Sequence, residues 1–123
     1  MSPVQRLCLA VLVAAACTTP SVPIPPPEPE RVYFSLDVDN GTASFSYAAE
    51  SSFADAVVYI FNRDAGEGII TTAEADGSVS PTAPFPALEG DEVVITFETK
   101  NQLSSTCVRM QEGQSSSGRE CSL

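Results

Sequence analysis

The sequence of 123 residues contains no histidine, no tryptophan and a single lysine, Lys100. Histidine is the commonest general base and metal ligand, so neither role can be filled here in the usual way. The serines, including the run 115–117, have no evident base to activate them as nucleophiles, and a flexible loop explains that run. Neither a glycine-rich phosphate loop nor a C-x-x-C motif is present. We therefore expect a protein that is not an enzyme and has no cofactor.

Basic residues are also scarce, because 6 Lys and Arg stand against 16 Asp and Glu, which gives a formal net charge of −10. A strongly acidic surface repels phosphate backbones and anionic head groups. This balance excludes nucleic acid as an expected partner. Solubility outside the cytoplasm is the simpler explanation of the charge.

No apolar run reaches the length of about 20 residues that a membrane-spanning helix needs. The longest run, Leu7–Ala16, follows the basic residue Arg6 and ends in three alanines before Cys17. Its length fits the hydrophobic region of a secretory signal, typically about 7–15 residues. We therefore expect export rather than a membrane span.

The apolar run, the small residues and Cys17 together resemble the signal and lipobox of bacterial lipoproteins. The resemblance implies that residues 1–16 are cleaved as a signal peptide and that Cys17 is acylated, with fatty acids such as palmitate. Cys17 would then anchor the protein in the membrane of the bacterial cell envelope. The family usually has Leu where Ala14 stands, and the three alanines also suit ordinary signal cleavage, so plain secretion is the alternative. Thr18, in place of the Asp that retains family members at the inner membrane, favours the outer membrane in a Gram-negative cell.

Four cysteines are present, and Cys8 lies in the expected signal peptide. In an oxidising compartment Cys107 and Cys121, fourteen positions apart, are expected to form a disulfide that pins the C-terminal segment. Lipidation of Cys17 would account for the cysteine that this pairing leaves over.

Proline divides the exported part of the chain. Residues 17–30 contain six of the prolines and no candidate core, so this segment is expected to be a semi-rigid polyproline tether. At roughly 3.1 Å per residue it would reach about 40 Å. Residues 31–123 are expected to form one domain.

Alternating apolar residues predict a β-hairpin at the start of that domain. The alternation covers residues 32–38 and 43–47, and Asn40-Gly41 between them suits a two-residue type I′ turn. The expected cross-strand pairs are Val38–Ala43, Leu36–Phe45 and Phe34–Tyr47.

Further strands are predicted along the rest of the chain. Residues 56–61 are apolar on both faces and predict a central strand covered on both sides. Pro81, Pro84 and Pro86 exclude a regular interior strand between the later segments. The other strands predicted after residue 61 are residues 68–73, 78–80, 92–97 and 105–111. Seven or so short strands in about 90 residues predict an all-β fold, a small antiparallel β-sandwich.

The stretch from Ala56 to Ser105 resembles bacterial Ig-like modules. The matching segments are residues 57–62 as a strand, 71–78 with an Asp-Gly turn, and 90–93 with a Gly-Asp corner that enters a strand. The resemblance implies an Ig-like sandwich, although the absence of tryptophan and the cysteine spacing exclude an antibody-type domain. Carboxypeptidase-regulatory-like and transthyretin-like sandwiches have similar turns and stay open as alternatives.

Calcium is the one metal that the sequence suggests. Asp37, Asp39 and Asn40 cluster at the first hairpin, with both aspartates expected on one strand face, and oxygen ligands suit Ca²⁺. Glu74 and Asp76 form a second acidic pair. Acids on a solvated strand explain both groups without a metal, and the spacing is not that of an EF-hand.

The expected function is that of a lipid-anchored, non-catalytic structural or binding module, adhesion-like, with the membrane and an envelope or extracellular protein or glycan as partners. The alternative is an accessory lipoprotein subunit of a larger envelope or secretion complex. A contiguous exposed apolar patch would favour the complex subunit, whereas a polar surface with an open strand edge would favour adhesive binding.

Overall fold

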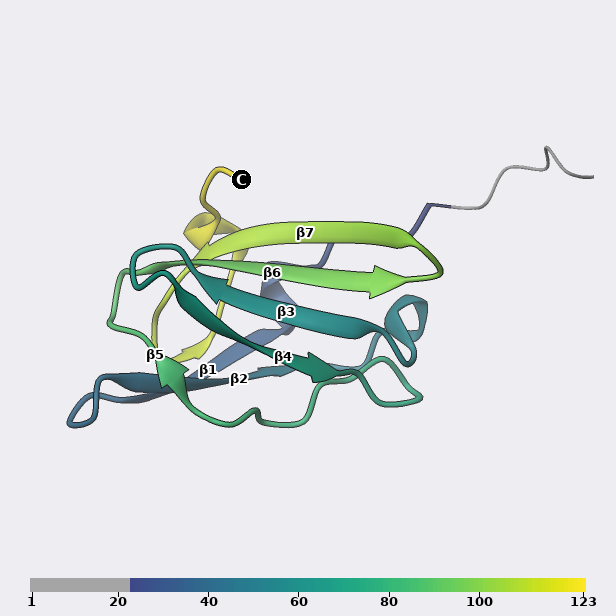
Figure 1. Cartoon of the computed structure of the whole chain (residues 1–123). Helices are drawn as coiled ribbons and strands as arrows, with labels where there is room; N and C mark the ends of the chain where they lie inside the picture. The colour runs from purple at the N-terminus through teal and green to yellow at the C-terminus, as the bar shows by residue number, and fades with distance from the viewer. Residues whose placement is uncertain (1–22) are drawn as a thin grey trace, which may run out of the picture.

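The computed structural model describes residues 23–123, so the signal segment and Cys17 lie outside the described residues. Two antiparallel four-stranded sheets lie one over the other (Figure 1). The first sheet has the strand order β5-β2-β1-β8 and the second β4-β3-β6-β7. The strands are β1 (Val32–Asp37), β2 (Thr42–Tyr47), β3 (Val57–Asn62), β4 (Glu67–Thr72), β5 (Phe85–Pro86), β6 (Glu92–Thr99), β7 (Gln102–Arg109) and β8 (Gly113–Gln114).

The prediction of a small all-β sandwich is confirmed. The only helices in the described part of the chain are three short 3-10 turns, η1 (Pro29–Arg31), η2 (Ser51–Phe53) and η3 (Ser117–Arg119). The second sheet has the order of the sheet that carries strands C and F in Ig-like sandwiches, with β3 and β6 paired at its centre. Between residues 23 and 123, no helix is long and apolar enough to cross a membrane.

The core lies between the two sheets and is rich in aromatic rings. Phe34 and Phe45 come from the first sheet and Phe97 from the second, and all three are fully buried. Phe53, on η2, stacks on Phe97 with ring centroids 4.1 Å apart, and Tyr47 lies 4.9 Å from the same ring. Burying such side chains stabilises a fold by roughly 1.5–3 kcal/mol each, so this cluster holds the two sheets together.

The first hairpin forms where it was predicted, but the predicted register is wrong by two residues. Phe34 pairs with Phe45 and Leu36 with Ala43, and a four-residue loop, 38–41, joins the strands. The Asp37 carboxylate explains the longer loop, because it accepts bonds from the Asn40 backbone N–H (3.2 Å) and side-chain amide (2.7 Å). Asn40 therefore does not take the positive φ of a type I′ turn. A shift of two keeps every side chain on its face.

A two-residue turn with positive φ at both positions joins β6 to β7 instead. Lys100 and Asn101 have φ of 48° and 65°, and Thr99 pairs with Gln102 around them. This turn lets β7 begin at Gln102, three residues before the strand predicted at 105–111. The strand predicted at 78–80 is reduced to one bridge between Tyr47 and Val79.

The central place of β3 is confirmed, but its predicted cover on both faces is wrong. β3 lies between β4 and β6, and Val58 and Ile60 point into the core. On the other face Phe61 is 45% exposed, and no element of the described structure lies over it. The apolar residues of β3 therefore serve two surfaces, one internal and one external.

Candidate interaction surfaces

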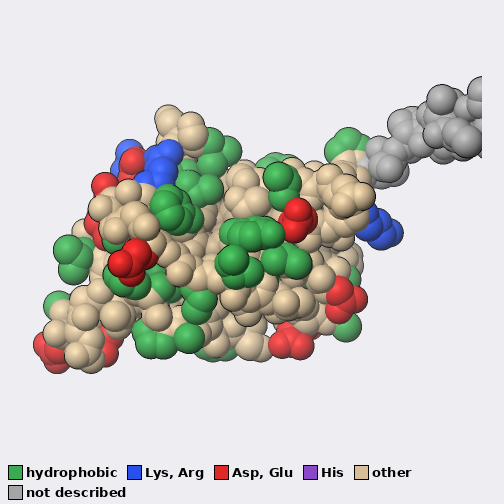
Figure 2. All heavy atoms as spheres, viewed as in Figure 1, with side chains coloured by type: hydrophobic (Ala, Val, Ile, Leu, Met, Phe, Trp, Pro, Cys, Tyr) green, Lys and Arg blue, Asp and Glu red, His purple; other side chains and the backbone are tan. Residues whose placement is uncertain are grey.

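The outer face of the second sheet carries a group of apolar side chains that we call the apolar face. Strand alternation places on it Val57, Tyr59 and Phe61 of β3, Ile70 of β4 and Val94 of β6. Ile70 is 66% exposed, and Figure 2 shows hydrophobic side chains gathered over β3. Cross-strand register puts Tyr59 opposite Ile70 and Phe61 opposite Val94, so the face is contiguous across three strands.

Two local features fix the shape of the apolar face. The Tyr59 hydroxyl donates to Glu98 Oε1 at 2.9 Å, and this bond raises the pKa of the tyrosine. Gly68 lies so close to β3 that an added Cβ would be 2.0 Å from the Ile60 carbonyl oxygen. Only glycine therefore lets β4 approach at this point, and a shallow hollow of about 290 Å³ is left beside Phe61 and Ile70.

The outer face of the first sheet has a different character. Tyr33 is the exposed aromatic residue there, and Ser35, Ser44 and Ser46 are its neighbours on β1 and β2. This polar face is what antiparallel sheets normally present to water. The apolar face is thus a property of one sheet and not of the whole surface.

Three of the four sheet edges are short or covered. β5 and β8 have two residues each, and β5 contains Pro86. Along β7 lies the proline-rich segment 23–28, where Ile24 N–H donates to Gln102 Oε1 (2.9 Å) and the Ser104 hydroxyl donates to the Pro25 carbonyl (2.8 Å). At the remaining edge β5 lies near β4, but no segment of residues 23–123 other than β3 is hydrogen-bonded to the backbone of residues 68–72.

The proline-rich segment is attached to the domain over residues 24–29. Ile24 packs against the hydrophobic core, and Pro27 and Pro29 are buried. The Glu28 N–H donates to the Tyr47 hydroxyl at 2.9 Å, and burial raises the pKa of that tyrosine. A sequence reading based on proline content alone missed these contacts, and Ile24 is the one apolar signal that could have indicated them.

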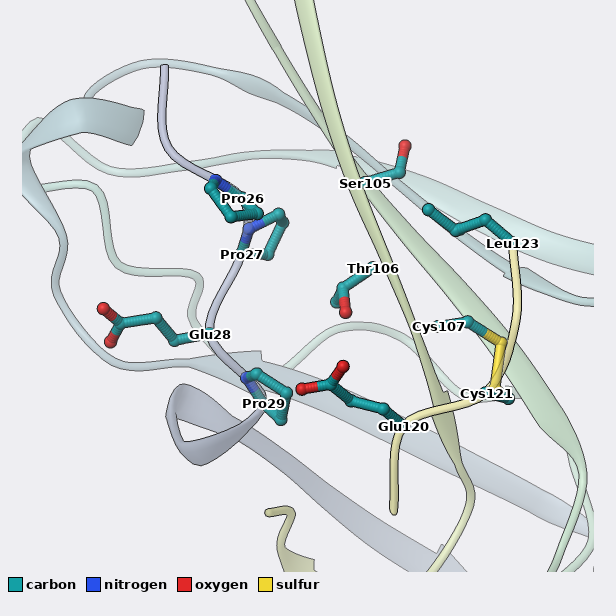
Figure 3. Close-up of a pocket in the computed structure, with 10 residues that line it drawn as sticks. All are labelled: Pro26, Pro27, Glu28, Pro29, Ser105, Thr106, Cys107, Glu120, Cys121 and Leu123. Atoms are coloured by element: carbon teal, nitrogen blue, oxygen red, sulfur yellow. A yellow bond between two sulfur atoms is a disulfide. The ribbon is translucent and has the colours of Figure 1, made fainter. Parts of the chain in front are cut away.

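An open cavity of about 390 Å³ lies between this segment and the C-terminal tail. Figure 3 shows Pro26 and Pro27 on one side, Leu123 and the disulfide on the other, and Ser105 with Thr106 between them. The predicted bond between Cys107 and Cys121 is confirmed. A backbone hydrogen bond from Cys121 N–H to the Cys107 carbonyl (2.9 Å) holds the same residues together.

The calcium candidates are brought together only in part. Asp37 ends β1 and bonds Asn40, whereas Asp39 lies in the loop, so the expectation of both aspartates on one strand face is wrong. In the second acidic pair, Glu74 accepts a bond from the Ser80 hydroxyl, and Asp76 accepts two from Ser78, which lower its pKa. Within residues 23–123, no group of three or more acidic, cysteine or histidine side chains could hold a metal ion.

Asn62, the last residue of the strand expected over residues 57–62, is a fully buried polar residue. Its side-chain amide donates to the Pro86 carbonyl (3.0 Å) and to Asp91 Oδ2 (2.8 Å). Its side-chain oxygen accepts from the backbone N–H groups of Asp64 and Ala65. One side chain thus ties the end of β3 to the following turn and to the loop before β6. Nothing in the local pattern distinguishes it from an exposed turn residue.

Similarity to known proteins assigns this chain to no family. The chain matches no protein-family model, no curated protein and no solved structure.

Proposed function

We propose that this protein is a lipid-anchored, non-catalytic binding module of the bacterial cell envelope, and that it recognises another protein through the apolar face. The lipid on Cys17 belongs to this proposal and rests on the lipobox-like sequence. The observation that carries the binding role is the contiguous apolar face on the outer side of the second sheet.

The contrast between the two outer faces supports this proposal. The first sheet presents serines, a threonine and a single aromatic residue, Tyr33, to solvent, whereas the second presents Phe61 and Ile70, 45% and 66% exposed, among other apolar residues. Scattered apolar residues are ordinary on a protein surface, but contiguous ones rimmed by polar groups mark interaction sites. Glu98 and Arg109 lie at the rim of this face.

The second candidate function is an accessory subunit of a larger envelope or secretion complex. The apolar face favours this candidate over a transient adhesive role, because the buried cores of long-lived interfaces are more apolar than the rest of a protein surface. The open β4 edge is compatible with both functions. In either case the partner binds the second sheet.

In-cell photo-cross-linking tests the proposal. A photo-reactive amino acid at Ile70 should give a protein adduct, whereas the same group at Ser35, exposed on the opposite sheet, should give none. Equal adducts from both positions, or none from Ile70, would contradict binding through the apolar face.

The anchor is tested separately. Cys17→Ser should block processing or release the protein from the membrane fraction, and metabolic labelling with a fatty acid should mark the native protein alone. A native protein that is soluble and carries no lipid mass on its N-terminal peptide would refute the anchor.

A further inference from the structure

We propose that β4 is a docking edge for an extended segment of the partner protein, with alternating apolar residues in its middle and basic residues at both ends. The proposal rests on the proposed function, because it states which chemistry the partner presents to the second sheet. Three observations support it: unpaired backbone groups on β4, the absence of charge at residues 68–72, and acidic residues at both ends of that stretch.

The hydrogen-bond pattern shows which backbone groups of β4 are unpaired. Ala73 N–H donates to the Ala56 carbonyl (2.8 Å), and Arg63 N–H donates to the Glu92 carbonyl (2.9 Å). Bonded positions alternate in an antiparallel ladder, so β3 uses its even-numbered residues toward β4 and its odd-numbered residues toward β6. The N–H and C=O groups of 68, 70 and 72 therefore point away from β3, and no hydrogen bond within residues 23–123 engages them.

The composition of β4 leaves this edge ready to pair. Gly68, Ile70 and Thr72 are exposed, and residues 68–72 carry no charge. Proteins usually protect a free edge with proline, charge or a covering segment, as this domain does at its other edges. An extended peptide can add to such an edge through main-chain hydrogen bonds.

The side chains define the middle of the incoming segment. Every second residue of an added strand lies on the same side of the sheet as Ile70. There it extends the apolar face beyond Ile70 and Tyr59, so apolar residues at alternate positions fit. Polar residues fit the positions between them.

The charges define the ends of the segment and argue against a second copy of this chain. Exposed acids lie at both ends of β4: Asp64 in the turn before it, Glu67 as its first residue, and Glu74 and Asp76 after it. The one cation between residues 62 and 80, Arg63, is bound to Glu92 at 2.9 Å. Two copies paired antiparallel through Ile70 would bring Glu67 of each close to Glu74 of the other, whereas lysine or arginine there would form ion pairs.

Two synthetic peptides test the inference with the purified full chain in detergent. Both have the central sequence Thr-Val-Thr-Val-Thr, flanked by lysine in one and by glutamate in the other. The lysine-flanked peptide should bind about tenfold more tightly at low ionic strength, as expected for two ion pairs gained rather than two repulsions. The ratio should shrink in 1 M salt, where the Debye length is about 3 Å. Backbone amide shifts on binding should be largest for residues 67–73.

Matched variants locate the binding. Ile70→Pro removes an outward N–H and no bond to β3, so the fold should be retained while peptide binding is lost. Ile70→Val keeps the N–H and a branched apolar side chain, and should bind as the native protein does. Circular dichroism and the thermal midpoint of each variant report the fold.

Four outcomes would overturn the docking edge: equal binding of the two peptides, shifts centred away from β4, full binding by a folded Ile70→Pro variant, or a dimer of the native chain that Ile70→Pro dissolves. The last result would make a second copy the occupant. A preference for lysine flanks that Ile70→Pro abolishes would support the edge even if cross-linking in cells gave no adduct from Ile70, a result that would overturn only the proposed function.

Discussion

Replacing Asn62 with alanine should lower the free energy of unfolding by about 3 kcal/mol, a large loss for a single substitution in a domain of this size. The side chain is fully buried and makes four hydrogen bonds to three separate segments. The bond to the Asp91 carboxylate is worth about 1.5–3 kcal/mol, and each neutral bond about 0.5–1.5 kcal/mol. The N–H groups of exposed Asp64 and Ala65 can bond to water in the variant. The free energy lost with these two bonds is therefore at the low end of the range for neutral bonds.

Urea denaturation at neutral pH measures this loss. The midpoint should fall with an unchanged slope, because the unfolded state exposes the same surface. The thermal midpoint should fall by about 10–20 °C, at about 4–8 °C per kcal/mol for a domain near 100 residues. Ser35→Ala is the control, since Ser35 is exposed on the outer face of the first sheet and its loss should change stability by less than about 0.5 kcal/mol.

A second variant distinguishes the loss of the Asn62 hydrogen bonds from the loss of side-chain volume, because it changes the charge and keeps the volume. Asn62→Asp keeps the shape but places a second carboxylate beside Asp91 Oδ2, now 2.8 Å from the amide nitrogen. Repulsion should raise the pKa of the pair, so the variant should be least stable at neutral pH and should recover stability as acid protonates one of the two groups. A loss below about 1 kcal/mol for Asn62→Ala, with the slope unchanged, would refute the reasoning.

Three further predictions follow from the fold. Replacing Cys107 and Cys121 with serine should remove up to about 3 kcal/mol in the chain-entropy model, and hydrogen exchange should speed up first in the C-terminal tail; faster exchange in the core instead would contradict this. Burial raises the pKa of Tyr47, so its contribution to stability should be intact below about pH 10 and lost as pH rises through the folded-state pKa, which ultraviolet titration of native and Tyr47→Phe proteins can detect. Ile24→Ser should weaken the attachment of the proline-rich segment and expose the backbone of β7 near Gln102 to exchange, whereas unchanged exchange would show that the attachment depends on other contacts.

Alternation predicted which residues face the core, because a period of two is a property of the strand itself. Val38 was wrongly expected to face inward, since it lies in the loop and is 83% exposed, but the other inward positions of the first hairpin were assigned correctly even though its register was not. The register depends on one side-chain interaction, Asp37 with Asn40, which competes with the turn that Asn-Gly favours. Such competition between two acceptable turns is decided by contacts that a local pattern does not contain.

The exposure of the apolar face was also not predicted from the sequence. A strand that is apolar on both sides is the usual sign of burial on both sides, and residues 56–61 match it. Here the same pattern accompanies an outer face on which Phe61 and Ile70 are exposed. The sequence therefore predicted the hydrophobicity of Phe61 correctly and its surroundings wrongly. The attachment of Ile24 was missed because six prolines dominate the composition of its segment.

The attachment of residues 24–29 also limits how far the domain could travel from an anchor. Pro23 is only six positions after Cys17, and six steps along the chain span at most about 20 Å. A lipid on Cys17 would therefore confine the domain to a thin layer next to the bilayer and restrict its rotation. Within that layer its effective concentration toward a membrane-attached partner is high, so a modest intrinsic affinity at the second sheet would suffice for association. A partner free in solution gains nothing from this confinement.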